Sequence, residues 1–150
     1  MKKFKFKLDA VLRYRKYRER NAQLELVKVK NAVVEKRQLI EKLKKNRLQA
    51  ILELKTCEEK GISVGRHRFY TNYITGTDHA LEEEQKQLVQ LEKVLRHHQE
   101  IVRKEQIKRK TLEKIEDIKK KEYISDYIKF EQKTMDEMVA IRHKPIKEAA

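Results

Sequence analysis

The sequence predicts an all-α protein: a long two-helix antiparallel coiled-coil hairpin, with the second helix overhanging at the open end. All three glycines fall between Gly61 and Gly76, and the only proline is Pro145. On both sides of the glycines the chain is rich in Lys, Glu, Gln, Leu, Arg and Ile, so long helices can form without interruption. Charged residues make up 41% of the 150 residues and aromatic residues 7%, which favours extended helices over a large core.

The first helix is expected over about residues 6–58. Alternate steps of four and three residues from Leu8 reach fifteen positions, of which eleven are apolar or small. An apolar repeat of about 3.5 residues is typical of a coiled-coil seam. These first-helix seam positions are Leu8, Leu12, Arg15, Glu19, Ala22, Leu26, Val29, Val33, Lys36, Ile40, Leu43, Arg47, Ala50, Leu54 and Cys57.

The turn is expected over about residues 59–63, and Ser63 can cap the second helix, which is expected over about residues 64–141. The three-four alternation continues in this second helix, first regularly and then with changes of register. Its regular seam positions are Tyr70, Ile74, Thr77, Leu81, Glu84, Leu88, Leu91, Leu95, His98 and Val102, and the later ones are Leu112, Ile115, Tyr123, Ile124, Ile128, Met135 and Met138.

The two predicted helices differ in length, so the second one should extend beyond the first. With the apex near Gly61, Leu8 is expected opposite residues near Leu112 or Ile115. The second helix then overhangs by about 20 residues, from Tyr123 to Arg142, or roughly 30 Å. Aromatic and Met side chains on an unpaired helix indicate a contact surface for another protein, although the overhang could instead fold back onto Phe4 and Phe6. The overhang carries Tyr127, Phe130, Met135 and Met138.

Composition predicts a single domain over residues 1–150. No apolar run approaches the roughly 18 residues that cross a bilayer, and there is no signal-peptide pattern, so we expect neither membrane insertion nor secretion. Cys57 is the only cysteine, which excludes an internal disulfide. The net charge is +14, and residues 1–20 hold nine basic and two acidic side chains. This basic segment should attract an acidic protein surface, nucleic acid or an anionic membrane, while many other Lys and Arg side chains could simply solvate the helices.

The sequence contains no pattern for catalysis, and we expect no enzyme activity, no cofactor and no metal site. It lacks a P-loop, a glycine-rich dinucleotide turn and a G-x-S-x-G motif. Neighbouring residues on a helix point about 100° apart, so His97 and His98 cannot readily share a metal ion. His67 with His79 is the other pair that could be proposed, but no Cys or H-E-x-x-H spacing completes a site there; the fifth histidine is His143.

Three segments together resemble the FliJ family of the flagellar type III export apparatus. The opening FKFKLDAVLRYR at residues 4–15 resembles the family's F-x-F-x-L-x-x-V-L-x-x-R start. The apex GIS at residues 61–63, with the aromatic residues that follow it, resembles the family's turn. The segment EQKTMDEM at residues 131–138, with its basic tail to Pro145, resembles the family's C-terminus. The resemblance covers nearly the whole chain.

The resemblance implies a coiled coil similar to the central stalk subunit of rotary ATPases. Its implied partners are the hexameric export ATPase, a membrane export-gate protein and the flagellar export chaperones, so it would be cytoplasmic and peripheral at the inner membrane. The implied gate contacts, near the apex, are Tyr70, Tyr73 and Ala80. The implied ATPase contacts, at the open end, are Phe4, Phe6, Leu8, Leu12, Arg13, Arg15, Tyr127, Phe130, Met135, Asp136, Glu137 and Met138.

The alternative function is a basic coiled coil that binds nucleic acid or an anionic membrane surface. Against nucleic acid, the chain lacks a basic helix running into a leucine zipper, base-reading side chains at repeating positions, and interleaved aromatic residues. We therefore expect no nucleic-acid partner. Residues 1–20 combine Phe4, Phe6, Leu8 and Leu12 with many cations, a composition that could lie on anionic lipid.

Overall fold

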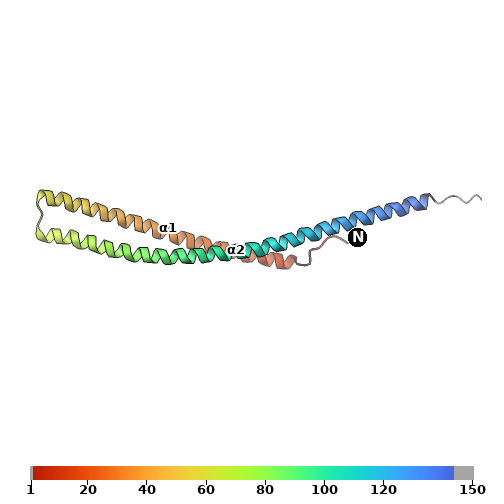
Figure 1. Ribbon diagram of the computed structural model, residues 1–150, viewed down its shortest axis with the longest axis horizontal. Helices are drawn as coiled ribbons and strands as arrows, with labels where there is room; N and C mark the ends of the chain where they lie inside the picture. Colours follow the sequence, from red (N-terminus) through yellow and green to blue (C-terminus); the bar gives the residue numbers. More distant parts are fainter. Residues whose placement is uncertain (1, 144–150) are drawn as a thin grey trace, which may run out of the picture. The chain divides into compact units, whose positions relative to one another are not determined.

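The computed structural model describes residues 2–143, and it contains two helices, α1 (Asp9–Lys60) and α2 (Val64–Arg142) (Figure 1). The helices are 52 and 79 residues long, pack against each other, and are accompanied by no strand in residues 2–143. This confirms the all-α helical hairpin. Pro145 lies outside the described residues. None of the described helices combines the length and apolarity needed to cross a membrane.

Helix ends follow local chemistry. α1 begins at Asp9, later than the expected start near residue 6, and the acidic side chain there suits the positive end of the helix dipole. At the apex, Gly61 has a φ of 88°, a left-handed conformation that glycine adopts without the strain of a Cβ. The Ser63 hydroxyl accepts a hydrogen bond from the Arg66 amide at 3.2 Å, which confirms the predicted N-cap of α2.

The chain divides into two compact units, and each is described by itself. The hairpin unit is residues 19–104, which contains most of α1, the apex and the first half of α2. The terminal unit is residues 1–18 together with residues 105–150, of which 2–18 and 105–143 are described.

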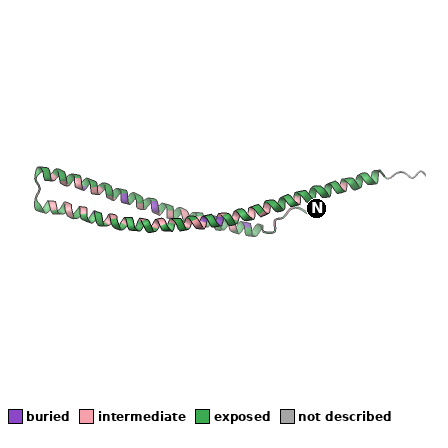
Figure 2. Cartoon of the chain, in the orientation of Figure 1, coloured by how far each residue is buried: buried purple, intermediate pink, exposed green. Residues whose placement is uncertain are grey.

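In the hairpin unit the predicted seam is confirmed at every position. All first-helix seam positions from Glu19 to Cys57 are buried or half-buried, and so are all regular second-helix positions from Tyr70 to Val102. Half-buried residues, with a few buried ones among them, recur along both helices (Figure 2). The buried apolar side chains of this unit are Val33, Ile40, Ala50 and Val102.

The two basic seam residues of the hairpin unit, Lys36 and Arg47, have acidic partners across the helices. Lys36 binds Glu84, itself a seam residue, and donates to Gln87 Oε1 at 2.8 Å. Arg47 forms an ion pair with Asp78. Because residues later in α1 meet residues earlier in α2, these pairs establish the antiparallel arrangement.

The terminal unit contains a paired part and an unpaired part. Leu12 is buried, and three of the later α2 seam positions, Leu112, Ile115 and Tyr123, are half-buried. Beyond Tyr123 every described residue is exposed except Thr134, which is half-buried, so the later apolar positions are left open. Leu8 is also exposed, contrary to the seam prediction, because it precedes the first residue of α1.

Candidate partner-binding surfaces

An aromatic row forms where the N-terminal segment meets α2 in the terminal unit. The Tyr123 hydroxyl donates a hydrogen bond to the Lys2 carbonyl at 2.8 Å, and the rings of Phe4 and Tyr123 lie 5.6 Å apart. Tyr123 also stacks on Tyr127, with ring centroids 6.4 Å apart. The overhang does not fold back here: residues of the N-terminal segment reach the beginning of the overhang instead. The site prediction omitted Tyr123, although its place four residues before Tyr127 could have indicated it.

The other N-terminal residues implied as ATPase contacts differ in how exposed their side chains are. Leu12 is only 3% exposed, so it belongs to the packing of the unit and is not available at its surface. Phe6 is half-buried. Arg13 is exposed and pairs with Asp9 at 3.3 Å, while the half-buried Arg15 lies over the Tyr14 ring at 5.7 Å. Leu8 and Arg13 are therefore the most accessible members of this set.

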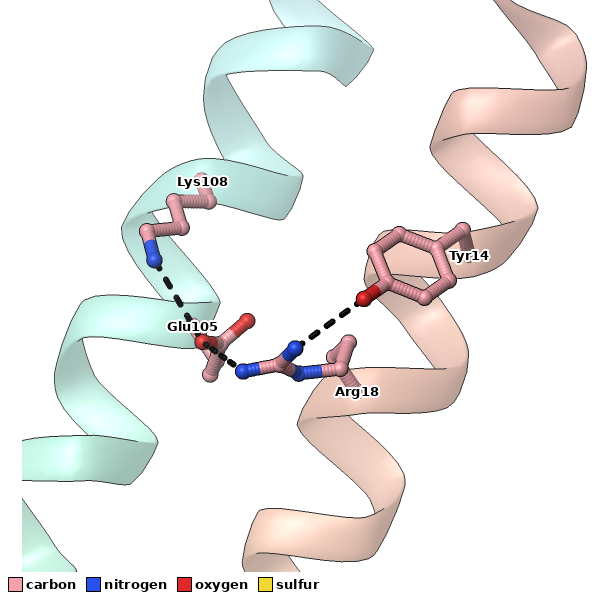
Figure 3. A network of polar contacts seen from close by, with 4 residues as sticks. All are labelled: Tyr14, Arg18, Glu105 and Lys108. Carbon is pink, nitrogen blue, oxygen red and sulfur yellow. Dashed lines mark hydrogen bonds and ion pairs between the residues drawn. The ribbon is translucent and has the colours of Figure 1, made fainter.

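A polar network joins α1 and α2 beside this surface (Figure 3). Arg18 Nη1 donates to the Tyr14 hydroxyl at 3.0 Å, and Arg18 Nη2 lies 3.6 Å from Glu105 Oε1. Lys108 Nζ lies 3.4 Å from the same oxygen. The hydrogen bond with Tyr14, supported by the charge of Glu105, raises the pKa of Arg18. Glu105 is 5% exposed and its Oε2 has no hydrogen-bond partner. The seam prediction did not include this network, although Glu105, its one buried member, lies three residues after the seam residue Val102.

The overhang presents its apolar side chains to solvent. Tyr127, Phe130, Met135 and Met138 are all exposed, as are Asp136 and Glu137 between them. A hydrogen bond with Glu131 raises the pKa of Tyr127. The site prediction omitted a shallow groove on the overhang, although the seam counting had already named its two isoleucines. This groove is lined by Lys121, Ile124, Ser125, Ile128, Lys129 and Gln132.

Near the apex, the accessible aromatic side chains differ from the implied gate contacts. Tyr70 and Ala80 are half-buried, whereas Tyr73 is 45% exposed and Phe69 is 69% exposed. Tyr70 belongs to the same alternation as Ile74, so its side chain turns toward α1 and helps to line a groove there. The accessible pair is therefore Phe69 and Tyr73, one helical turn apart. Phe69 also contacts Tyr70 edge to face, at 6.1 Å between centroids.

Among the described residues, no three His, Cys, Asp or Glu side chains are grouped so that they could hold a metal ion. His67 contacts Glu58 at 3.2 Å across the apex. His97 and His98 lie edge to face with centroids 5.9 Å apart.

Comparison with known proteins gives one family. A family model described as Flagellar FliJ protein matches residues 4–145, nearly the whole chain. Neither the curated proteins nor the solved structures contain a match to this chain. The family match covers both units, including the N-terminal segment, the apex and the overhang. The chain therefore belongs to the FliJ family and is a component of the flagellar protein-export apparatus.

Proposed function

We propose that the open end of this protein binds the hexameric flagellar export ATPase as a stalk-like coiled coil. Binding promotes assembly of the ATPase ring and raises its hydrolysis of ATP, without contributing a catalytic group. We further propose that the protein links the ATPase to the export gate and to export chaperones, at the cytoplasmic face of the inner membrane.

The overhang is the observation that carries this proposal. Large apolar side chains that could have been placed in a seam are instead exposed along one uncovered helix. Such a surface is stabilised when a partner covers it. Its neighbour in the same unit is the basic N-terminal segment, where Lys2, Lys3, Lys5 and Lys7 are exposed. A cationic and apolar end of this kind suits the acidic or apolar lining of a protein ring.

Stimulation of the ATPase needs no group of this chain in the reaction. A ligand that binds the assembled ring more tightly than free subunits shifts the equilibrium toward the ring. The apolar side chains of the overhang would supply burial, and Arg13 and Arg15 would supply attachment that weakens as salt rises. This mechanism predicts that stimulation disappears at ATPase concentrations where the ring is already fully assembled.

The test is ATP hydrolysis by the purified export ATPase with variants of this chain. Replacing Phe130 and Met138 with Ser should abolish most of the stimulation, because both side chains are exposed and their loss leaves the folded hairpin intact. The matched control replaces Val89 and Val94, two exposed apolar residues of α2 in the hairpin unit. Deletion of residues 1–15 or 127–150 should each abolish stimulation, and full stimulation by both truncated chains would contradict the proposal.

The apex is our proposed contact with the export gate, now through Tyr73 and Phe69. Tyr73→Ala should weaken gate binding and leave thermal unfolding nearly unchanged. Tyr70→Ala should lower the unfolding temperature, because Tyr70 is half-buried against α1. Gate binding that survives the loss of both Phe69 and Tyr73 would place the contact elsewhere.

Direct membrane binding is the competing explanation for the basic N-terminal segment. Phe4 and Phe6 are half-buried and Phe4 packs on Tyr123, so these rings are not free to enter lipid without local opening. Sedimentation with anionic and with neutral liposomes separates the two functions. If the protein binds anionic liposomes as tightly as it binds the ATPase, membrane binding becomes the favoured function of this segment.

A further inference from the structure

The outer side of α1 in the hairpin unit carries an apolar stripe that the hairpin leaves uncovered. Five large side chains lie on the side of α1 away from the seam, three within residues 24–34 and two within residues 48–52. Between the two groups the same side carries Gln38, Glu41 and Lys45. Each of the five large side chains is between 49% and 57% exposed. We call these residues the outer stripe: Leu24, Val27, Val34, Leu48 and Leu52. Outer positions of a two-stranded coiled coil are usually polar, because solvent covers them.

A shallow groove continues the stripe toward the apex. It is lined by Leu48, Leu52 and Thr56 of α1 together with Tyr70 of α2. A second shallow depression begins at Val34 and shares Lys45 with the first. From Leu24 to Leu52 the stripe measures about 42 Å along the helix, which is enough for a partner helix of about 28 residues.

The charge beside the stripe is strongly one-sided. Lys30, Lys42 and Lys45 are exposed and have no ion pair or hydrogen bond within residues 2–143. Lys28 and Lys44 are also cations of this side, and each lies near one glutamate of its own helix. The acidic side chains beside the stripe are fewer: Glu35 and Glu41 lie on this side of α1, and Glu53 lines the groove. Any helix lying on the stripe would therefore meet mostly positive flanks.

We propose that the outer stripe binds an amphipathic helix of a partner protein whose apolar face is flanked by acidic side chains. The stripe would bury the apolar face, while the unpaired lysines would form ion pairs with the flanks. Two copies of this chain facing each other through the stripe would instead bring like charges together, which opposes self-association. This surface belongs to the hairpin unit, so it is separate from the ATPase contact proposed above and does not depend on it.

The experiment uses the full chain and three designed helical peptides of about 28 residues, a length set by the stripe. The first probe has a leucine face with glutamate flanks, the second the same face with lysine flanks, and the third glutamate flanks with serine in place of leucine. Fluorescence anisotropy should show binding of the first probe at least about tenfold tighter than of either other probe. Its affinity should fall as salt rises.

Variants of the chain then locate the binding surface. Leu48→Ser with Leu52→Ser, and separately Lys42→Glu with Lys45→Glu, should each weaken the first probe at least about tenfold. The matched controls, Val89→Ser with Val94→Ser and Lys93→Glu with Lys104→Glu, change exposed residues of α2 and should leave binding within about twofold. Circular dichroism confirms that each variant retains its helices.

Three results would overturn the proposal. Equal binding of the serine probe would mean a general polyanion surface, nucleic acid included. Equal weakening by the control variants would mean that the peptide lies elsewhere. A dimer in sedimentation equilibrium that Leu48→Ser with Leu52→Ser dissociates would mean that the stripe is covered by a second copy.

Discussion

The hairpin unit and the overhang of the terminal unit use the same kinds of residue and reach opposite states. In the hairpin unit, Val33 and Ile40 are buried because a second helix lies opposite them. In the overhang, Ile128 and Met135 occur at similar spacings and are exposed. Apolar spacing therefore reports a face that is able to pack. Whether such a face packs within the chain depends on whether the other helix is long enough to lie opposite it. The covered face stabilises the fold, and the uncovered face is the candidate binding surface.

The largest expected difference between the two regions comes from a pair of matched truncations. Ile40→Ala should lower the free energy of unfolding by about 2–5 kcal/mol, because it leaves a cavity in the seam. Ile128→Ala removes the same atoms from an exposed position and should stay within about 0.5 kcal/mol. Urea unfolding followed by circular dichroism measures both. Similar losses would mean that the overhang is packed in solution.

A second prediction concerns the buried carboxylate of the terminal unit. Glu105→Leu should be neutral or raise stability by about 1 kcal/mol, since it removes a buried charge with one unsatisfied oxygen. Arg18→Leu should destabilise, because Glu105 would keep only the 3.4 Å contact with Lys108. The double variant should be more stable than Arg18→Leu alone. Urea midpoints of the four proteins test this, and a strongly destabilised Glu105→Leu would show that the network is a net source of stability.

A third prediction concerns the contact between the N-terminal segment and α2. Tyr123→Phe loses the hydrogen bond to the Lys2 carbonyl, which should weaken this local contact by about 0.5–1.5 kcal/mol. The segment would then open several times more often, and trypsin should cut after Lys5 and Lys7 correspondingly faster. Tyr127→Phe is the control, because Tyr127 stacks on Tyr123 but the Lys2 carbonyl accepts from Tyr123. Unchanged cleavage in Tyr123→Phe would indicate that the Phe4 ring alone holds the segment.

The smallest expected effect is a pH dependence from an exposed pair of the hairpin unit. The hydrogen bond from Arg103 lowers the pKa of Glu100 below its ordinary value of 4.5. A lowered pKa in the folded state stabilises the fold above the unfolded pKa, and this contribution is lost as the pH falls through the folded value. Glu100→Gln should therefore flatten the loss of stability below about pH 4.5 slightly. Urea midpoints between pH 7 and pH 3 measure it, and a steeper loss in the variant would contradict the assigned sign.

Sequence spacing predicted the seam of the hairpin unit well because a coiled coil is periodic, and its two helices can pair along their apolar faces in few ways. The exceptions occur where periodicity stops applying. The repeat predicts a seam position at Leu8, which precedes α1. The implied gate contacts pair Tyr70 with Tyr73, although the alternation through Ile74 directs Tyr70 toward α1. The contact between Phe4 and Tyr123 joins an irregular segment to a helix, so no repeat describes it.

The sequence by itself determined the two helices, the apex and the buried face of each helix. Glycines confined to one window, the Ser63 cap and a sustained apolar repeat are local signals, and they act whatever the rest of the chain does. Only the tertiary structure decided which side chains of separate segments meet. The contact of Phe4 with Tyr123 and the pairing of Arg18 with Glu105 depend on which residues lie opposite. Burial and ion pairing are properties of two surfaces in contact, whereas a repeat describes only one.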